Sequence, residues 1–264
     1  MRSETRTTVR SFRIIEEIKR QDGARSEQLA EELEITRSTI HRHLQTLIEQ
    51  GYIIKEGEIY HIDLKFLNFG EYARSRKRAY ILAEDTLYDL TDETEEECEF
   101  IVENDGRGIL VYDTYHPKSN FQGAEGDNMK NPTHSTGTYF HLHSHAAGKA
   151  ILAEFPKEYV ETIVDQWGLP PKTDQTITTS DELWAELERI KERGVADTDE
   201  EFTTGLREVA KCVKNPNGTL LGAITIIGPT YRMQEPRFSE ELPNLLKNHV
   251  SKLEKRIEKE YFKP

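Results

Sequence analysis

Apolar residues recur every three or four positions in three segments near the N-terminus, a spacing that predicts amphipathic helices. The segments are 11–21, 26–34 and 37–50, separated by Gly23 and by the turn Ile35-Thr36. Their apolar positions are Phe12, Ile15 and Ile18, then Leu29, Ala30 and Leu33, then Ile40, Leu44, Leu47 and Ile48. Two helices of this size joined by a short turn form a helix-turn-helix.

A hairpin is predicted directly behind these helices. Two short β-rich runs, 52–55 and 58–62, follow Gly51 and flank Glu56-Gly57. A hairpin in this position is a wing, and the order of helices and wing is far more specific than any single helix. We therefore expect residues 1–62 to form a winged helix-turn-helix that binds DNA.

The second helix of such a unit enters the major groove with its N-terminal residues at the base edges. Arginine can pair bidentately with guanine, while serine and threonine hydroxyls can bind bases or phosphates. In the wing and the first helix, basic residues can contact phosphates. We predict six DNA contacts: Arg10, Arg37, Ser38, Thr39, Arg42 and Lys55. A merely solvated helix face is the alternative for Arg42, and the roles of His41 and His43 stay open.

Charge is distributed unevenly along the chain, whose formal net charge is −13 at pH 7. Residues 1–78 carry 15 Lys and Arg against 13 Asp and Glu, whereas residues 79–264 carry 20 against 35. The excess acid therefore lies outside residues 1–78, which are neutral to slightly basic. Surplus carboxylate suits the high-salt cytoplasm of a halophilic archaeon, and it equally suits ordinary solubilising charge.

Several classes of protein are disfavoured. The chain has no apolar run long enough for a membrane span, and its first ten residues lack the apolar segment of a secretory signal. Cys98 and Cys212 lie far apart without a CxxC partner, which favours a reducing cytoplasm over a disulfide or zinc scaffold. Hydrolase motifs such as GxSxG and HExxH are absent. We expect a cytoplasmic protein with no catalytic residues, no cofactor and no bound metal.

Residues 63–80 predict a linker helix that ends in a basic cluster, although Gly70 interrupts its sequence pattern. That cluster could reach DNA phosphate or pair with acid on the following domain. Residues 81–264 alternate predicted strands and helices, which indicates an α+β domain on an antiparallel sheet. The strands are 99–103, 108–114, 139–143, 209–214 and 220–227, and the helices are 81–96, 145–154, 157–167, 181–193 and 239–261.

The segment 137–153, GTYFHLHSHAAGKAILA, has the most chemical interest. A strand leads to Ser144, a residue suited to an N-cap, and the next helix opens with Ala146, Ala147 and Gly148. Free N–H groups at a helix start attract anions, and small side chains allow a ligand to approach closely. A ligand carboxylate would fit this place.

His141, His143 and His145 alternate in the same segment. On a continued strand they would share one face, which leaves a metal-responsive regulator as an alternative. The competing interpretation is that the helix begins before His145 and spreads the imidazoles apart. An enzyme with an accessory DNA-binding domain is a further alternative, although no nucleophile–base arrangement supports it.

Four segments, in order and in register, resemble the IclR family of bacterial and archaeal transcription regulators. They are RSTIHRHLQTLIEQGYI, HLHSHAAGKAILA, DEEFTTGLREVAKCV and GAITIIGP, and the resemblance covers nearly the whole chain. It implies a winged helix, a linker helix and a GAF-like effector domain. It also implies homodimers, often paired as dimers of dimers, on palindromic promoter DNA, with a small-molecule effector controlling catabolic genes. Repression and activation are both open.

The resemblance also implies a pocket on the concave face of the effector-domain sheet. Carried over to this chain, the pocket residues are Ala146, Ala147, Asp199, Glu208, Thr225 and Ile227, with His143 nearby. Glu208 and Ile227 depart from the small or sulfur-bearing residues often found at these positions in similar proteins. A second carboxylate near Asp199 disfavours a simple anion unless His143 or a cation compensates. Sugars and polyols therefore join sugar acids and other organic acids as expected effectors.

Overall fold

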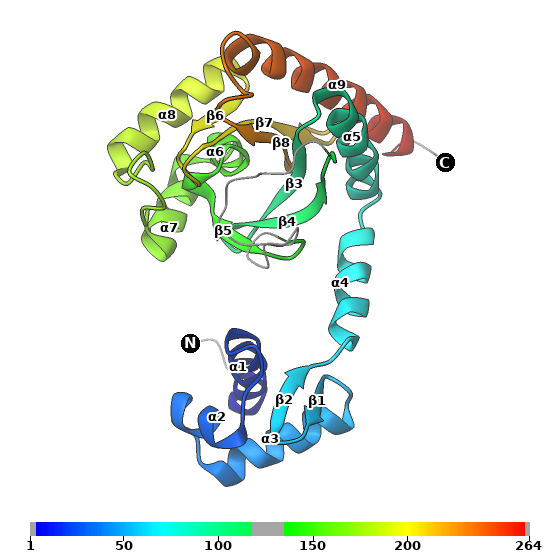
Figure 1. The fold of residues 1–264 in the computed structure, drawn as a ribbon, viewed down its shortest axis with the longest axis vertical. Coiled ribbons are helices and arrows are strands. Elements are labelled where there is room, and N and C mark those ends of the chain that lie inside the picture. The colour runs from blue at the N-terminus through cyan, green and yellow to red at the C-terminus, as the bar shows by residue number, and fades with distance from the viewer. Residues whose placement is uncertain (1–3, 118–134, 262–264) are drawn as a thin grey trace. The chain divides into compact units, whose positions relative to one another are not determined.

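The computed structural model describes residues 4–117 and 135–261. The chain forms two compact units, residues 1–74 and 75–264 (Figure 1). Among the described residues, none of the helices combines the length and the apolar character needed to cross a membrane.

The first unit is a three-helix bundle followed by a hairpin and a further helix. Its elements are α1 (Arg6–Arg20), α2 (Ser26–Glu32), α3 (Arg37–Glu49), β1 (Ile53–Glu56), β2 (Ile59–Ile62) and α4 (Lys65–Ser75). The antiparallel β1–β2 hairpin turns at Gly57, whose φ of +60° a residue with a side chain rarely adopts. This confirms the predicted helix-turn-helix and its wing.

The core of this unit corrects one detail of the predicted first helix. Ile14 and Ile18 are its buried residues, whereas Phe12 is 58% exposed. Together with Leu29 and Leu44 these isoleucines belong to one apolar cluster. The apolar residues of α1 cover more than one face, so spacing alone assigned Phe12 to the core wrongly.

The predicted linker helix is two helices. α4 ends at Ser75 and α5 (Arg78–Thr94) begins three residues later. Gly70 lies inside α4, so the helix continues through the glycine that interrupts its sequence pattern. α4 packs on the hairpin entrance, where the Tyr52 ring lies 5.4 Å from Phe66 and 6.0 Å from Phe69.

The second unit is built on a six-stranded antiparallel sheet with the order β5-β4-β3-β8-β7-β6. Its strands are β3 (Glu97–Asn104), β4 (Arg107–Thr114), β5 (Tyr139–His141), β6 (Ala196–Asp199), β7 (Leu206–Lys214) and β8 (Leu220–Pro229). Its other helices are α6 (Ala146–Ala153), α7 (Lys157–Trp167), α8 (Ser180–Arg193) and α9 (Leu242–Tyr261). The sequence missed β6, a four-residue edge strand.

Helices cover both faces of this sheet (Figure 1). α5 and α9 enclose one apolar cluster with residues such as Phe100 and Ile224. α6, α7 and α8 enclose another, in which Ile101 and Ala223 come from the same two strands. Successive residues of β3 and β8 thus point to opposite faces. The architecture confirms the predicted α+β class.

Candidate functional sites

The first turn of α3 presents a stripe of polar side chains. Arg37, Ser38 and Arg42 are exposed, and Thr39 is half-buried. The Thr39 hydroxyl accepts hydrogen bonds from the Thr36 hydroxyl at 2.9 Å and from the Arg42 guanidinium at 3.5 Å. Because the opposite face of α3 is buried in the core, this stripe is the face that can enter a groove.

The two remaining predicted DNA contacts lie on neighbouring elements. Arg10 is exposed on α1, and Lys55 is exposed on β1 of the wing. The Lys55 ammonium lies 3.6 Å from the Glu58 carboxylate and 5.4 Å from the centre of the Tyr60 ring. All six predicted side chains are thus at least partly accessible, on three elements of one unit.

His43 has a structural place between α1 and α3. It is buried, and its Nδ1 lies 2.8 Å from the Ser11 hydroxyl. Burial, and then the charges of Arg10 and Arg42, lower the pKa of His43, so its ring is neutral at neutral pH. His41, two residues earlier, is exposed.

In the second unit, three buried glutamates lie on the sheet face toward α6. Glu97 and Glu99 come from β3, and Glu208 comes from β7. The register places Ile227 between Glu97 and Glu208, and Thr225 beside Glu99. Buried carboxylates are costly unless charge or hydrogen-bond partners stabilise them, so this face is arranged for polar contacts.

Glu208 closes the start of α6. One of its carboxylate oxygens accepts a hydrogen bond from the Ala146 backbone N–H at 2.6 Å, and the other lies 3.2 Å from Nδ1 of His145. Burial by itself would raise the pKa of Glu208. The charge and hydrogen bond of His145, with the bonds from Ala146 and Thr198, outweigh burial and lower it. The carboxylate is therefore ionised at neutral pH.

The His145 ring is fully buried between two aromatic rings. Its centre lies 4.0 Å from that of Phe140 and 3.7 Å from that of Phe202. Phe202 belongs to the turn between β6 and β7, so this turn covers the start of α6. The imidazole is thus held in one orientation toward Glu208.

The small residues at the start of α6 have a packing reason. A side chain at Gly148 would collide with the backbone of Leu142, in the 3-10 turn Leu142–Ser144 that precedes the helix. Ala146 and Ala147 are also fully buried. The backbone of the turn therefore lies directly on the first turn of α6.

Asp199 lies apart from the other predicted pocket residues. In the β6–β7 register it pairs with Arg207, whereas Thr198 pairs with Glu208, so Asp199 and Glu208 point to opposite faces. Its carboxylate forms two 2.8 Å hydrogen bonds with the Arg207 guanidinium and is half exposed. The expectation that Glu208 stands beside Asp199 is wrong. The buried carboxylates across the sheet from Glu208 are those of β3.

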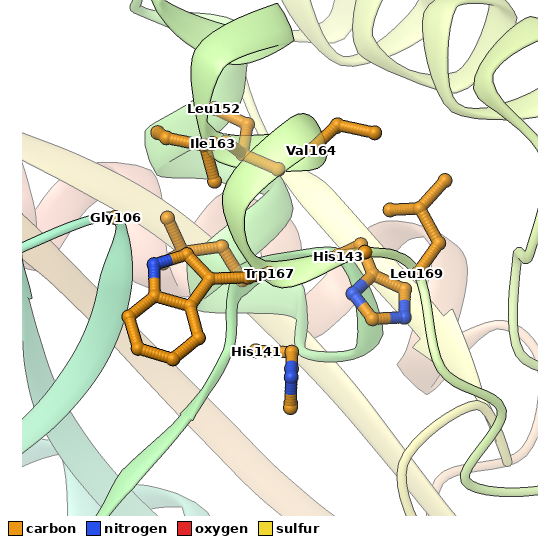
Figure 2. A pocket seen from close by; sticks show the side chains of 10 residues that line it. Gly106, His141, His143, Leu152, Ile163, Val164, Trp167 and Leu169 are labelled. Atoms are coloured by element: carbon orange, nitrogen blue, oxygen red, sulfur yellow. The ribbon is translucent and has the colours of Figure 1, made fainter.

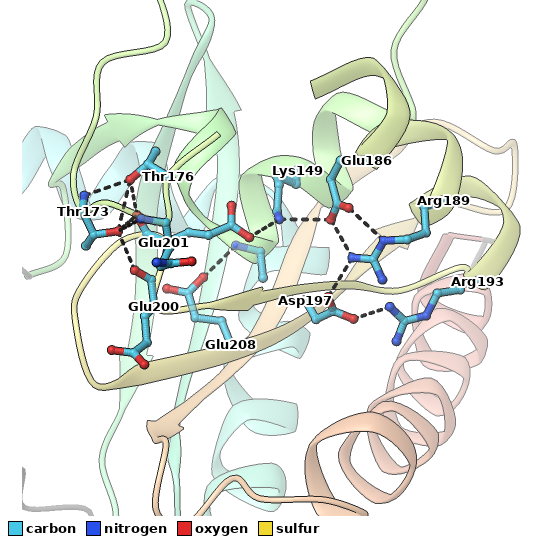
Figure 3. A network of polar contacts seen from close by, with 12 residues as sticks. Lys149, Thr173, Thr176, Glu186, Arg189, Arg193, Asp197, Glu200, Glu201 and Glu208 are labelled. Carbon is cyan, nitrogen blue, oxygen red and sulfur yellow. Dashed lines mark hydrogen bonds and ion pairs between the residues drawn. The ribbon is translucent and has the colours of Figure 1, made fainter. Parts of the chain in front are cut away.

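A buried lysine, which sequence reasoning passed over, also belongs to this region (Figure 3). Lys149 of α6 is 1% exposed, and its ammonium lies 3.0 Å from Glu186 of α8 and 2.7 Å from Glu201. Burial raises the pKa of Glu201 to about 7, against the attraction of Lys149 and reinforced by the charges of Glu186 and Glu208. The only sequence signal was a charged residue inside the apolar run AAGKAILA.

The turn that carries Glu201 and Phe202 is held from a second side. The Thr173 hydroxyl donates to the Glu200 carbonyl at 2.6 Å, and the Thr176 hydroxyl donates to the Glu201 carbonyl at 2.6 Å. These contacts are drawn with the lysine network in Figure 3. The turn over the start of α6 is therefore held by hydrogen bonds to its backbone carbonyls and by the ion pair between Glu201 and Lys149.

The three alternating histidines do not converge. The 3-10 turn ends the strand at His141, and α6 begins after His145, not before it as the competing interpretation held. His141 and His143 line a small pocket beside Trp167 (Figure 2), and their ring centres are 5.8 Å apart. Across residues 4–117 and 135–261, no group of three His, Cys, Asp or Glu side chains is placed to hold a metal ion.

Burial is the main cause of the low pKa of His143, which is about 4. Its Nε2 lies 3.1 Å from the Pro170 carbonyl oxygen. The ring is therefore neutral at neutral pH, and it provides no positive charge to compensate an anion. This removes one of the two ways in which a simple anionic effector was expected to be tolerated.

Comparison with known proteins assigns both units. Residues 7–57 match the IclR helix-turn-helix domain, and residues 75–255 match the C-terminal domain of bacterial transcriptional regulator IclR. The chain is 27% identical over 253 residues to the probable HTH-type transcriptional regulator ArcR of Halobacterium salinarum, covering 96% of this chain and 94% of that one. It is 26% identical over 243 residues to the transcriptional repressor IclR of Escherichia coli, covering 90% and 85%.

The fold is also similar to a solved structure. The crystal structure of the Thermotoga maritima IclR superposes with a TM-score of 0.71 at 24% identity. The match covers 96% of this chain and 99% of that chain, so both units of the fold are represented in it.

Proposed function

The chain belongs to the IclR family of transcription regulators, and from that premise we propose that Arg10, Arg37, Ser38, Thr39, Arg42 and Lys55 form its DNA contacts at a palindromic promoter site of catabolic genes. The observation that carries this assignment is the polar stripe at the start of α3. The opposite face of that helix, with Ile40 and Leu44, holds the core of the unit. The arginines can read base edges, and Lys55 and Arg10 can neutralise phosphates.

The test is a fluorescence-anisotropy titration on duplexes that the wild-type protein selects from a random-sequence pool. Arg37→Ala and Arg42→Ala should each weaken binding by roughly 5- to 150-fold, because a bidentate base contact contributes about 1–3 kcal/mol. Lys252→Ala removes the same charge from an exposed position on α9 and should leave the affinity unchanged. Wild-type affinity in both arginine variants would refute the assignment.

We further propose that the protein binds DNA as a homodimer, alone or as a dimer of dimers. A palindromic site needs two copies of the recognition helix. The first unit also exposes apolar side chains, among them Phe12 of α1 and Leu67 of α4, which are 58% and 60% exposed. A second copy would cover them. Phe12→Glu and Leu67→Glu should shift the sedimentation coefficient toward that of the monomer, and an unchanged coefficient would argue against this surface.

The effector is best described as a molecule that donates hydrogen bonds, such as a sugar or polyol. Glu97, Glu99 and Glu208 place ionisable oxygen acceptors on the sheet face toward α6. His143, which was expected to compensate an anion, is neutral. Carboxylates accept hydrogen bonds from hydroxyls and repel anions. Calorimetric titration with sugars, sugar acids and aromatic acids tests this expectation. A response confined to aromatic acids would exclude it.

Effector binding would act by population shift. A ligand that binds one arrangement of the effector domain more tightly changes the fraction of protein able to engage both half-sites. We propose that the effector is released unchanged, in the cytoplasm, without a catalytic step. Incubation of the protein with a bound effector, followed by mass spectrometry, should recover that effector intact, and formation of a product would indicate an enzyme.

A further inference from the structure

We propose that Glu208 is a specificity-determining residue that acts as an internal ligand: its carboxylate fills the start of α6 and excludes small carboxylates from it. This inference rests on the proposed effector site and names the residue that decides which charge the site accepts. The start of α6 is already occupied by the Glu208 carboxylate, which contacts Ala146 and His145.

The contacts of Glu208 are those that a bound carboxylate would make. One oxygen accepts from the Ala146 N–H at 2.6 Å, and the second lies 3.2 Å from Nδ1 of His145. Backbone N–H groups at a helix start and an imidazole are both donors suited to an anion. With Glu208 in place, the Ala146 N–H has its hydrogen-bond acceptor and the His145 ring faces a carboxylate at ion-pair distance, both from within the chain.

The surroundings are built to hold a carboxylate independently of the helix end. The His145 ring has no exposed surface, and the rings of Phe140 and Phe202 hold it on both sides. Apolar walls lower the local dielectric, and this strengthens the electrostatic interaction between a buried donor and the acceptor that it faces. Ala146 and Ala147 leave no bulky side chain at this point.

The Glu208 side chain beyond its Cβ has the size and charge of acetate. Glu208→Ala therefore removes an acetate-sized group and leaves the Ala146 N–H and the His145 ring without their acceptor. A free acetate ion can enter that space and restore both contacts. Glu208→Gln keeps the volume and keeps one oxygen that can accept from Ala146, so it should leave no room for acetate.

The experiment compares thermal unfolding of the full-length wild type, Glu208→Ala and Glu208→Gln in sodium acetate and in sodium chloride of equal ionic strength. Glu208→Ala should melt well below wild type in chloride. It should recover several degrees in acetate, saturably, with a smaller recovery in the bulkier butyrate. For wild type, and likewise for Glu208→Gln, the melting temperature should be the same in acetate as in chloride. Equal responses of Glu208→Ala to acetate and chloride would overturn the proposal.

Two further measurements keep the test decisive. If Glu208→Ala does not fold in chloride, its refolded yield should rise in acetate, and an equally low yield in both salts counts against the proposal. Calorimetry of wild type with acetate and pyruvate should show no saturable binding. Binding that Glu208→Gln abolishes would mean that Glu208 recruits carboxylates, which contradicts the proposal.

The rescue experiment does not depend on the effector assignment. If wild type binds no sugar or polyol but Glu208→Ala is rescued by acetate, the proposed effector class fails and the internal ligand stands. If wild type responds to polyols and acetate does not rescue Glu208→Ala, the reverse holds. The two proposals are therefore separated by different variants and different ligands.

Discussion

Glu201 should make the stability of the effector domain fall as the pH rises toward neutral. The perturbation is Glu201→Gln, which keeps the shape of the side chain and removes its titration. In the folded protein burial raises the pKa of Glu201 to about 7, from an ordinary value of 4.5. The carboxyl is 13% exposed, and its Oε2 is buried without a hydrogen-bond partner among the described residues.

The sign and size follow from proton linkage. Between pH 4.5 and 7 the folded state holds a proton on Glu201 that the unfolded state has released, so raising the pH through this window removes stability. A shift of one pKa unit corresponds to about 1.4 kcal/mol, which gives a loss of about 3 kcal/mol for wild type. Glu186, on the other side of Lys149, behaves differently. Its pKa is lowered because hydrogen bonds with Arg189 and Lys149 outweigh its burial.

The assay is urea denaturation of wild type and Glu201→Gln at pH 5, 6, 7 and 8, followed by circular dichroism. The difference between the two proteins should change by about 2.5 kcal/mol over this range, with wild type losing relative stability as the pH rises. The difference between wild type and Glu201→Gln cancels the contributions of other titrating groups. One of these is His143, whose lowered pKa adds stability as the pH rises. Parallel stability profiles would refute the reasoning.

Three further outcomes test the packing and the charge network. Lys149→Met should destabilise the protein by about 3–5 kcal/mol in urea denaturation, because it leaves Glu186 and Glu201 buried without their shared cation. Gly148→Ala should lower the melting temperature more than Ala150→Gly, because the added methyl group meets the Leu142 backbone; equal effects would contradict the close approach. Leu44→Ala should lower the free energy of unfolding by about 2–5 kcal/mol in chemical denaturation. It should weaken DNA binding only because part of the protein is unfolded, so the affinity of the folded fraction should equal that of wild type.

The N-terminal unit could be predicted because its signals are local. Helix spacing, the turn at Ile35-Thr36 and the Glu56-Gly57 turn of the wing all act within a few residues. The error at Phe12 arose where α1 carries apolar residues on more than one face. Which face is buried depends on packing against α3, and the buried face is that of Ile14 and Ile18.

For the effector domain, the sequence predicts the α+β class but not the contacts between residues that lie far apart in the chain. Glu208 and Ala146 are 62 residues apart, and their hydrogen bond depends on how β7 meets α6. The opposite orientations of Asp199 and Glu208 depend on the β6–β7 register, which a four-residue strand with two aspartates does not reveal. Lys149 likewise depends on partners from α8 and from the β6–β7 turn.

Genome-wide mapping of bound DNA tests the central claim most directly. We expect discrete sites with inverted half-sites about 10 base pairs apart, centre to centre. Occupancy of these sites should be lost in an Arg37→Ala, Arg42→Ala double variant and kept in Lys252→Ala. Sites that persist in the double variant, or binding without any inverted repeat, would contradict the assignment of α3 as the element that reads DNA.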